Sequence, residues 1–177
     1  MSELRHELCR KRDAKVIHGP LRDLIDAYAQ PGEVRWIGLR TARRAKVVSV
    51  EMAEVTDDGL TGDHGASQKR AVTLIQSEHL PVIGAMLGRD VVSPEVLRRN
   101  LVVSAVNLSA LKGRQVRLGS SILEITGICA PCSRMEEALG HGGYSAMRGH
   151  GGWCARVIEP GRIALGDRVI PLTSPAP

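Results

Sequence analysis

The stretch RQVRLGSSILEITGICAPCSRMEEALG, residues 114–140, carries the strongest indication of fold in this sequence. Its first half predicts two strands joined by a two-residue hairpin turn at positions 119–120. Its second half changes to a short helical pattern, which ends at Gly140. Cys129 and Cys132 lie between the two halves. The sequence therefore predicts a β-hairpin that delivers two cysteines to the start of a helix.

Strand-like segments lie on both sides of this stretch. Their lengths and β-branched residues are typical of strands. They are VRWIGLR (34–40), AKVVSVEMAEV (45–55), RAVTLIQ (70–76) and LVVSAVNL (101–108), then CARVIEPGRIALGDRVIPL (154–172) as two strands around a turn at Pro160 and Gly161. Strands dominate without regular alternation with helices. We therefore expect a mainly β fold with a few α helices, a closed or nearly closed barrel.

The predicted helices are few. SEHLPVIGAMLG (77–88) predicts a short helix with Ser77 as its cap, and SPEVLRRN (93–100) predicts a second one with Ser93 as its cap. The tract HGGYSAMRGHGGW (141–153) is rich in glycine and is expected to be flexible.

The chain has 177 residues, which is enough for one well-buried domain. We place this domain at residues 34–170. Residues 1–33 are expected to form an N-terminal arm with one short surface helix in GPLRDLIDAYAQ (19–30). Residues 171–177 are expected to form a disordered tail.

The composition predicts an aliphatic core, because 43% of residues are hydrophobic while only 2% are aromatic and Phe is absent. The net charge is +5, with basic clusters at RKRDAK (10–15) and RTARRAK (40–46). These clusters are interpreted as solvated faces. No aromatic stacking platform accompanies them, so a small anionic ligand is favoured over nucleic acid.

The sequence shows neither the apolar segment of a signal peptide nor a run of about 18 apolar residues that could span a membrane. A cytoplasmic protein without a membrane partner is expected. In that reducing compartment, the cysteines should be thiols rather than a disulfide framework. There are four of them: Cys9, Cys129, Cys132 and Cys154.

Cys132 follows a proline and precedes a helical pattern. Its sulfur would lie near the free N–H groups and the positive end of the helix dipole, which favours thiolate, and Arg134 adds a positive charge. A thiolate is the form that acts as nucleophile or soft-metal ligand. The alternative interpretation is a small buried residue.

Cys129 and Cys132 together form a CxxC pattern. A structural zinc site needs about four ligands, and no second CxxC or HxxxH is present. A thioredoxin-like pair would be expected early in a βαβ fold rather than late in a strand-rich chain. Both interpretations are disfavoured but stay open. A third is that Cys129 is an accessory thiol, which could resolve a persulfide or sulfenate on Cys132 by forming a disulfide.

Two further regions hold candidate site residues. The glycine-rich loop GLTGDHGASQKRAVTL (59–74) places polar groups, Asp63, His64 and Arg70 among them, before an apolar strand, either as turn geometry or as a ligand-facing loop. In GHGGWCARV, Gly152 would let the backbone approach a ligand and Trp153 could wall a pocket, although glycine flexibility explains the pattern equally well.

Taken in order, GLTGDH, RAVTLIQSEHL, RRNLVVS, the hairpin with its PC and GRIALGDRV resemble the MOSC domain, the C-terminal module of molybdenum cofactor sulfurases, which also occurs as stand-alone bacterial proteins. The resemblance covers roughly residues 34–170. It implies a β-barrel related to the barrel domain of pyruvate kinase.

The resemblance also implies roles for particular residues. The PC cysteine, Cys132, corresponds to the cysteine that carries a persulfide in the sulfurases or binds molybdenum in amidoxime-reducing enzymes. Four further residues match the family pattern around the same cleft: Asp63, His64, Arg70 and Asn100. Arg70 and Arg134 could bind a cofactor phosphate.

The implied function is binding of the molybdenum cofactor or sulfur carriage, with Cys132 as ligand or persulfide acceptor. One alternative is a molybdenum-dependent reductase of N-hydroxylated compounds, and another is a non-catalytic module that docks an acidic partner. The partner would be a sulfur donor such as a cysteine desulfurase, or an electron-donor protein. No pyridoxal phosphate is expected, because the chain is too short to include the sulfurase domain that binds it.

Overall fold

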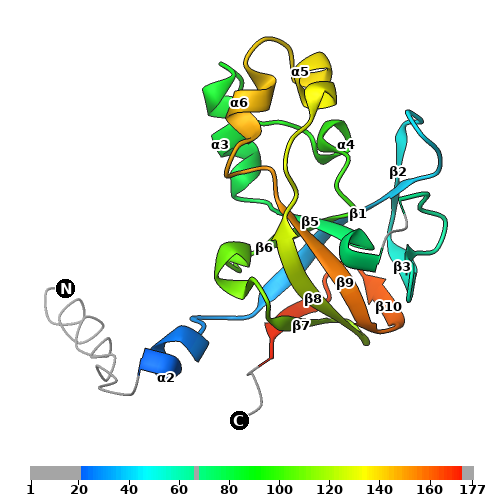
Figure 1. Ribbon diagram of the computed structural model, residues 1–177, viewed down its shortest axis with the longest axis vertical. Helices are drawn as coiled ribbons and strands as arrows, with labels where there is room; N and C mark the ends of the chain where they lie inside the picture. The colour runs from blue at the N-terminus through cyan, green and yellow to red at the C-terminus, as the bar shows by residue number, and fades with distance from the viewer. Residues whose placement is uncertain (1–20, 66–67, 173–177) are drawn as a thin grey trace, which may run out of the picture.

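The computed structural model describes residues 21–65 and 68–172. Within them, the largest sheet has eight strands in the order β11-β7-β8-β9-β5-β6-β1-β2, and a pairing of β11 with β1 closes the first seven into a barrel (Figure 1). The strands of this sheet are β1 (Gly32–Arg40), β2 (Val47–Val50), β5 (Val72–Gln76), β6 (Leu101–Ser104), β7 (Gln115–Leu118), β8 (Ser121–Ile128), β9 (Trp153–Glu159) and β11 (Arg168–Pro171). The predicted mainly β barrel is confirmed.

A small second sheet, β10-β3-β4, flanks the barrel, with β3 at Met52–Thr56, β4 at Gly59–Leu60 and β10 at Gly161–Ala164. The helices are short. They are α2 (Leu21–Asp26), α3 (His79–Met86), α4 (Pro94–Leu97), α5 (Ser133–Leu139) and α6 (Gly143–Met147), with 3-10 turns η1 (Gln68–Arg70) and η2 (Leu108–Leu111). No helix in the described ranges is long and apolar enough to cross a membrane.

The strands β5 and β6 are parallel neighbours in an otherwise antiparallel barrel, and both are buried on two faces. Leu74 and Val103 face the barrel core, whereas Ile75 and Val102 belong to a second apolar cluster. That cluster lies under α3, α5 and α6, which gather at one end of the molecule (Figure 1). Burial on both faces explains why these strands are continuously apolar.

The predicted hairpin is present, with Leu118 opposite Ser121 across the two-residue turn. The core is aliphatic as predicted, because the partly buried Trp36 and Trp153 only pack against its margins. Gly140 ends α5 with a φ of 89°. These features depend on local sequence signals and on composition, which explains why they could be predicted.

Three strand and helix predictions were wrong. The segment 45–55 is two strands, since β2 pairs with β1 whereas β3 pairs with β10. The segment 154–172 is three strands, because a turn at Gly166 separates β10 from β11. The helix α3 has Glu78, not Ser77, at its N-cap.

The tract predicted to be flexible contains α6. Glu136 of α5 accepts hydrogen bonds from the backbone N–H groups of Gly142 and Tyr144, both at 2.8 Å. These bonds satisfy two free donors at the start of α6 from another helix. A tertiary cap therefore overcomes the low helix propensity of the glycines.

The described part of the predicted arm contains α2, inside the segment expected to be helical. At the other end, β11 runs to Pro171 and the Leu172 N–H donates to the Gln115 carbonyl at 2.9 Å. The tail predicted from residue 171 therefore includes two ordered positions. Residues 1–20 and 173–177 lie outside the described residues.

Candidate functional site

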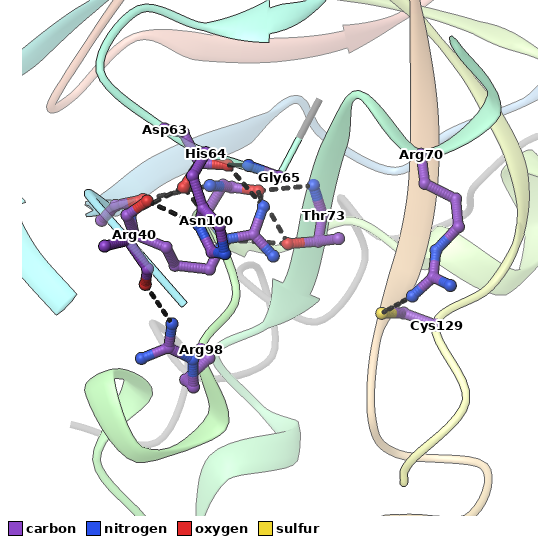
Figure 2. A network of polar contacts seen from close by, with 11 residues as sticks. Arg40, Asp63, His64, Gly65, Arg70, Thr73, Arg98, Asn100 and Cys129 are labelled. Atoms are coloured by element: carbon purple, nitrogen blue, oxygen red, sulfur yellow. Dashed lines mark hydrogen bonds and ion pairs between the residues drawn. The ribbon is translucent and has the colours of Figure 1, made fainter. Parts of the chain in front are cut away.

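An ion pair between Arg40 and Asp63 joins the end of β1 to the loop after β4 (Figure 2). Arg40 Nη2 lies 2.5 Å from Asp63 Oδ2, and Asp63 Oδ1 accepts from Arg40 Nε at 2.9 Å and from the Arg40 backbone N–H at 2.6 Å. The Asp63 side chain is only 2% exposed. Burial alone would raise the pKa of Asp63, but the hydrogen bonds and charge of Arg40 outweigh it and lower that pKa.

Asn100 continues this network into the barrel wall. Its side-chain oxygen accepts hydrogen bonds from Arg40 Nη2 at 3.0 Å, from the Thr73 N–H at 3.0 Å and from the Thr73 hydroxyl at 2.8 Å. Its side-chain nitrogen donates to the Gly38 carbonyl at 3.2 Å. Asn100 and Asp63 are therefore already engaged by protein partners, and they hold the loop against the barrel.

His64 lies next to this network but faces outward. Its backbone N–H donates to the Arg40 carbonyl at 2.8 Å, and its Nδ1 lies 2.8 Å from the same oxygen. The residue is exposed. The structure thus brings Asp63, His64 and Asn100 together, with His64 as the accessible member, whereas Arg70 lies at Cys129.

A cationic pocket of about 430 Å³ opens beside the network. Its charged lining residues come from the β1–β2 connection, from α4 and the residue after it, and from α5: Arg44, Lys46, Glu95, Arg98 and Arg134. Burial, together with the positive charges of Arg134 and Arg40, lowers the pKa of Arg98. The four cations face one carboxylate, so the pocket favours an anionic ligand.

Two arginines of this pocket have left-handed backbone conformations, Arg44 with φ 66° and Arg98 with φ 54°. This conformation costs a residue with a side chain roughly 1–2 kcal/mol. The Arg98 guanidinium is fixed by the Ala45 carbonyl, and it points toward the Arg40–Asp63 pair (Figure 2). Such strain recurs at ligand-binding positions.

Cys132 is exposed and is the N-cap residue of α5, and no side-chain capping bond engages its sulfur. It lies two positions before Arg134, which lines the cationic pocket. The sequence placed Cys132 at a helix start, and the structure does so too. The small buried thiol is instead Cys129.

Cys129 follows β8 and lies beside Cys154 of β9. Its N–H donates to the Gly152 carbonyl at 2.9 Å, and Arg70 Nη2 lies 4.0 Å from its sulfur (Figure 2). Arg70 therefore contacts the thiol that was considered accessory. It does not line the cationic pocket that contains Arg134, so the two arginines predicted to bind one phosphate belong to different pockets.

The buried side chain of Arg99 donates hydrogen bonds to three backbone carbonyl groups, including that of Cys129. Its Nε donates to the Gly151 carbonyl at 2.6 Å, its Nη1 to the Leu97 carbonyl at 2.9 Å and its Nη2 to the Cys129 carbonyl at 3.3 Å. Among the described residues, Arg99 forms no salt bridge with a carboxylate. Its charge therefore acts on the neighbouring sulfurs.

These neighbouring groups shift the pKa values of Cys129 and Cys154 in opposite directions. A hydrogen bond from Cys154 and the charges of Arg99 and Arg70 outweigh burial and lower the pKa of Cys129 to about 5. The same hydrogen bond and burial raise the pKa of Cys154. Cys129 is thus the more acidic of the two thiols.

Gly152 and Trp153 pack against other parts of the barrel. Gly152 has a φ of 93°, and its backbone presses against the Leu74 carbonyl of β5. Trp153 is half-buried and packs against the barrel core. Neither residue lines the pockets that contain Arg70 and Arg134.

Sequence reasoning missed Arg40, Arg98, Arg99 and Thr73. The only available signal was the position of the arginines in RTARRAK and in the RR pair before Asn100. No groups of three or more side chains suited to hold a metal ion occur in the parts of the chain that the structure describes. A metal there would depend on few protein ligands.

The ionisation of Cys129 can be tested by removing its hydrogen-bond donor. In a Cys9→Ser, Cys132→Ser background, thiolate absorbance measured against pH should show Cys129 ionising at about 5. Cys154→Ala should raise the Cys129 pKa toward its usual range, whereas Cys154→Ser should raise it less because a hydroxyl still donates. An unchanged pKa in Cys154→Ala would contradict the assignment.

Comparison with known structures shows the same fold. The YuaD protein of Bacillus subtilis aligns with a TM-score of 0.72 and 16% identity over 79% of this chain and 94% of that one. YiiM of Geobacillus stearothermophilus aligns with a TM-score of 0.68 and 16% identity over 80% and 75%. YiiM of Escherichia coli aligns with a TM-score of 0.65 and 19% identity over 84% and 72%.

Comparison with curated proteins finds no match. The family model of the MOSC domain matches residues 61–170, from the loop that contains Asp63 to the last strand. The match includes both thiol positions of the CxxC pattern and spans more than half of the chain. This protein therefore belongs to the MOSC domain family.

Proposed function

We propose that this protein binds the molybdenum cofactor or carries sulfur for it, with the Cys132 sulfur as metal ligand or persulfide acceptor. The MOSC family is linked to this cofactor. The observation that supports the proposal is the position of Cys132, an exposed thiol at the start of the helix that also supplies Arg134 to the cationic pocket.

The residues present suit the chemistry of the cofactor. A thiolate is a soft ligand for a metal of this kind, and a pterin phosphate would be held by the cations of the pocket. Arg98 and Arg134 would bind and orient the phosphate, and the Ala45 carbonyl would keep the Arg98 side chain in place. When bound, molybdenum would supply two-electron redox chemistry. Cys132 would also be accessible to an external sulfur donor such as a cysteine desulfurase.

The cofactor branch is tested by the molybdenum content of protein purified from a host that makes the cofactor. Cys132→Ser and Arg134→Glu should each lower molybdenum per chain about tenfold or more. The first removes the proposed thiolate ligand, and the second reverses a cation that would bind the phosphate. Arg117→Glu, which reverses an exposed cation of β7 outside the pocket, is the matched control and should bind like the wild type. Equal loading of all variants would refute the branch.

The sulfur branch is tested by incubation with a cysteine desulfurase and cysteine, followed by mass spectrometry of the peptides. One added sulfur should be found on Cys132 in the wild type and in Cys129→Ser. Added sulfur on Cys129 alone would contradict the assignment. Turnover of an N-hydroxylated compound in the presence of an electron-donor protein would instead identify the reductase alternative.

A further inference from the structure

A second thiol site lies on the other side of β5 from the Arg40–Asp63 pair. Gly127 of β8 is the register partner of Cys154 of β9, and Cys129 lies two residues beyond Gly127. Residues two apart on a strand share a face, so the two sulfurs project to the same side. The Cys154 sulfur lies 4.0 Å from the backbone oxygen of Ile128, the residue before Cys129. This pair does not include Cys132.

Positive charge surrounds the pair. The Arg70 guanidinium points at the Cys129 sulfur (Figure 2), and the buried Arg99 binds the Cys129 carbonyl. Because Arg99 has no carboxylate partner among the described residues, a thiolate at Cys129 is the nearby anion that offsets its buried charge. The site therefore stabilises a nucleophilic sulfur.

Access to the pair is narrow. Cys129 and Cys154 are each 3% exposed. A pocket of about 240 Å³ is lined by Arg70, Thr126 and Cys154, together with Ile128 and Ala130, the two chain neighbours of Cys129. Such a site admits a small polar electrophile and excludes a bulky disulfide such as oxidised glutathione. A peroxide is the small electrophile that a thiolate next to a second thiol reduces.

We propose that Cys129 and Cys154 form a peroxide-reducing dithiol, with Cys129 as the attacking sulfur and Cys154 as the resolving thiol. The Cys129 thiolate attacks one oxygen of hydrogen peroxide. The O–O bond breaks as an S–O bond forms, which leaves a sulfenic acid on Cys129 and a hydroxide that takes a proton from solvent to become water. Arg70 donates hydrogen bonds to the charge that develops on the leaving oxygen.

The Cys154 thiol then attacks the sulfenic sulfur. The S–O bond breaks as the S–S bond forms, and the hydroxyl leaves with the Cys154 proton as a second water. The two sulfurs together lose two electrons and the peroxide gains them. The disulfide requires the two sulfurs to approach to about 2 Å of each other.

The proposal is tested with hydrogen peroxide in a Cys9→Ser, Cys132→Ser background. Peptide mass spectrometry should find a Cys129–Cys154 disulfide, and Cys154→Ser should instead accumulate a sulfenic acid on Cys129, trapped with dimedone. Arg70→Gln should slow the reaction about tenfold, the effect of one lost charge-assisted hydrogen bond. Arg117→Gln, an exposed control, should not slow it.

Other outcomes would overturn the proposal. In the wild type, peroxide oxidation of Cys132 with Cys129 unmodified, or a Cys129–Cys132 disulfide, would assign the chemistry to the exposed thiol. Reaction of Cys129 with oxidised glutathione at a rate comparable to peroxide would refute the small-electrophile selectivity. The wild-type measurements need no variant to fold. Since Cys132 is absent from the tested background, molybdenum binding can fail without affecting this result.

Discussion

Asp63→Ala is expected to lower the free energy of unfolding by about 3–5 kcal/mol, the usual effect of removing one partner of a buried ion pair. The substitution leaves the Arg40 guanidinium, whose side chain is 15% exposed, without its counter-ion, and it removes the acceptor of the Arg40 backbone N–H. The measurement is urea-induced unfolding. Asp90→Ala, at an exposed aspartate, is the matched control and should change stability by less than about 0.5 kcal/mol.

The same ion pair makes stability depend on pH in acid. The pKa of Asp63 lies below its ordinary value of 3.8 in the folded protein. Its contribution is therefore present above that ordinary value and is lost as the pH falls through the lower folded value. The stability difference between wild type and Asp63→Asn should narrow below about pH 4. A loss under about 1 kcal/mol in Asp63→Ala at neutral pH would show that the pair does not hold the loop.

Gly152→Ala is expected to lower the free energy of unfolding by about 2–5 kcal/mol, because the left-handed backbone and overpacking both oppose a side chain there. The added Cβ would collide with the Leu74 carbonyl of β5. Because the Gly152 carbonyl accepts a hydrogen bond from the Cys129 N–H, Cys129 should move with Gly152. Unfolding in urea measures the loss, and the iodoacetamide reaction rate of Cys129 reports on the movement.

Gly149→Ala is the control for this substitution. Gly149 also has a positive φ, 80°, but a Cβ there meets nothing within 4 Å. It should therefore show only the backbone cost of about 1–2 kcal/mol and leave Cys129 reactivity unchanged. Equal losses of unfolding free energy in Gly152→Ala and Gly149→Ala would mean that the close contact of Gly152 with β5 does not affect stability.

The two cysteines of the CxxC pattern differ more than their spacing indicates. Cys132 is exposed at a helix start near the cationic pocket, which suits exchange with a partner or a cofactor. Cys129 is buried between Arg70 and Arg99, which suits a stabilised thiolate that only small molecules reach. The structure thus supports a separate role for each thiol.

The sequence by itself determined the features that depend on neighbours in the chain. The two-residue turn at positions 119–120 predicts the hairpin. Pro131 and the helical pattern after it predict the start of α5, and Gly140 predicts its end. Turn and capping preferences are local, so the residue types alone predict them. The ordered motifs likewise indicate the MOSC family, because they are read from the residue types alone.

Only the tertiary structure decided which sulfur has the lowered pKa. The groups that lower the Cys129 pKa are Cys154, Arg99 and Arg70, and Arg70 reaches the sulfur from 59 positions away in the sequence. Their approach follows from the pairing of β8 with β9 and of β9 with β5. Electrostatic effects depend on distance in space, which the closed barrel fixes and local sequence patterns do not.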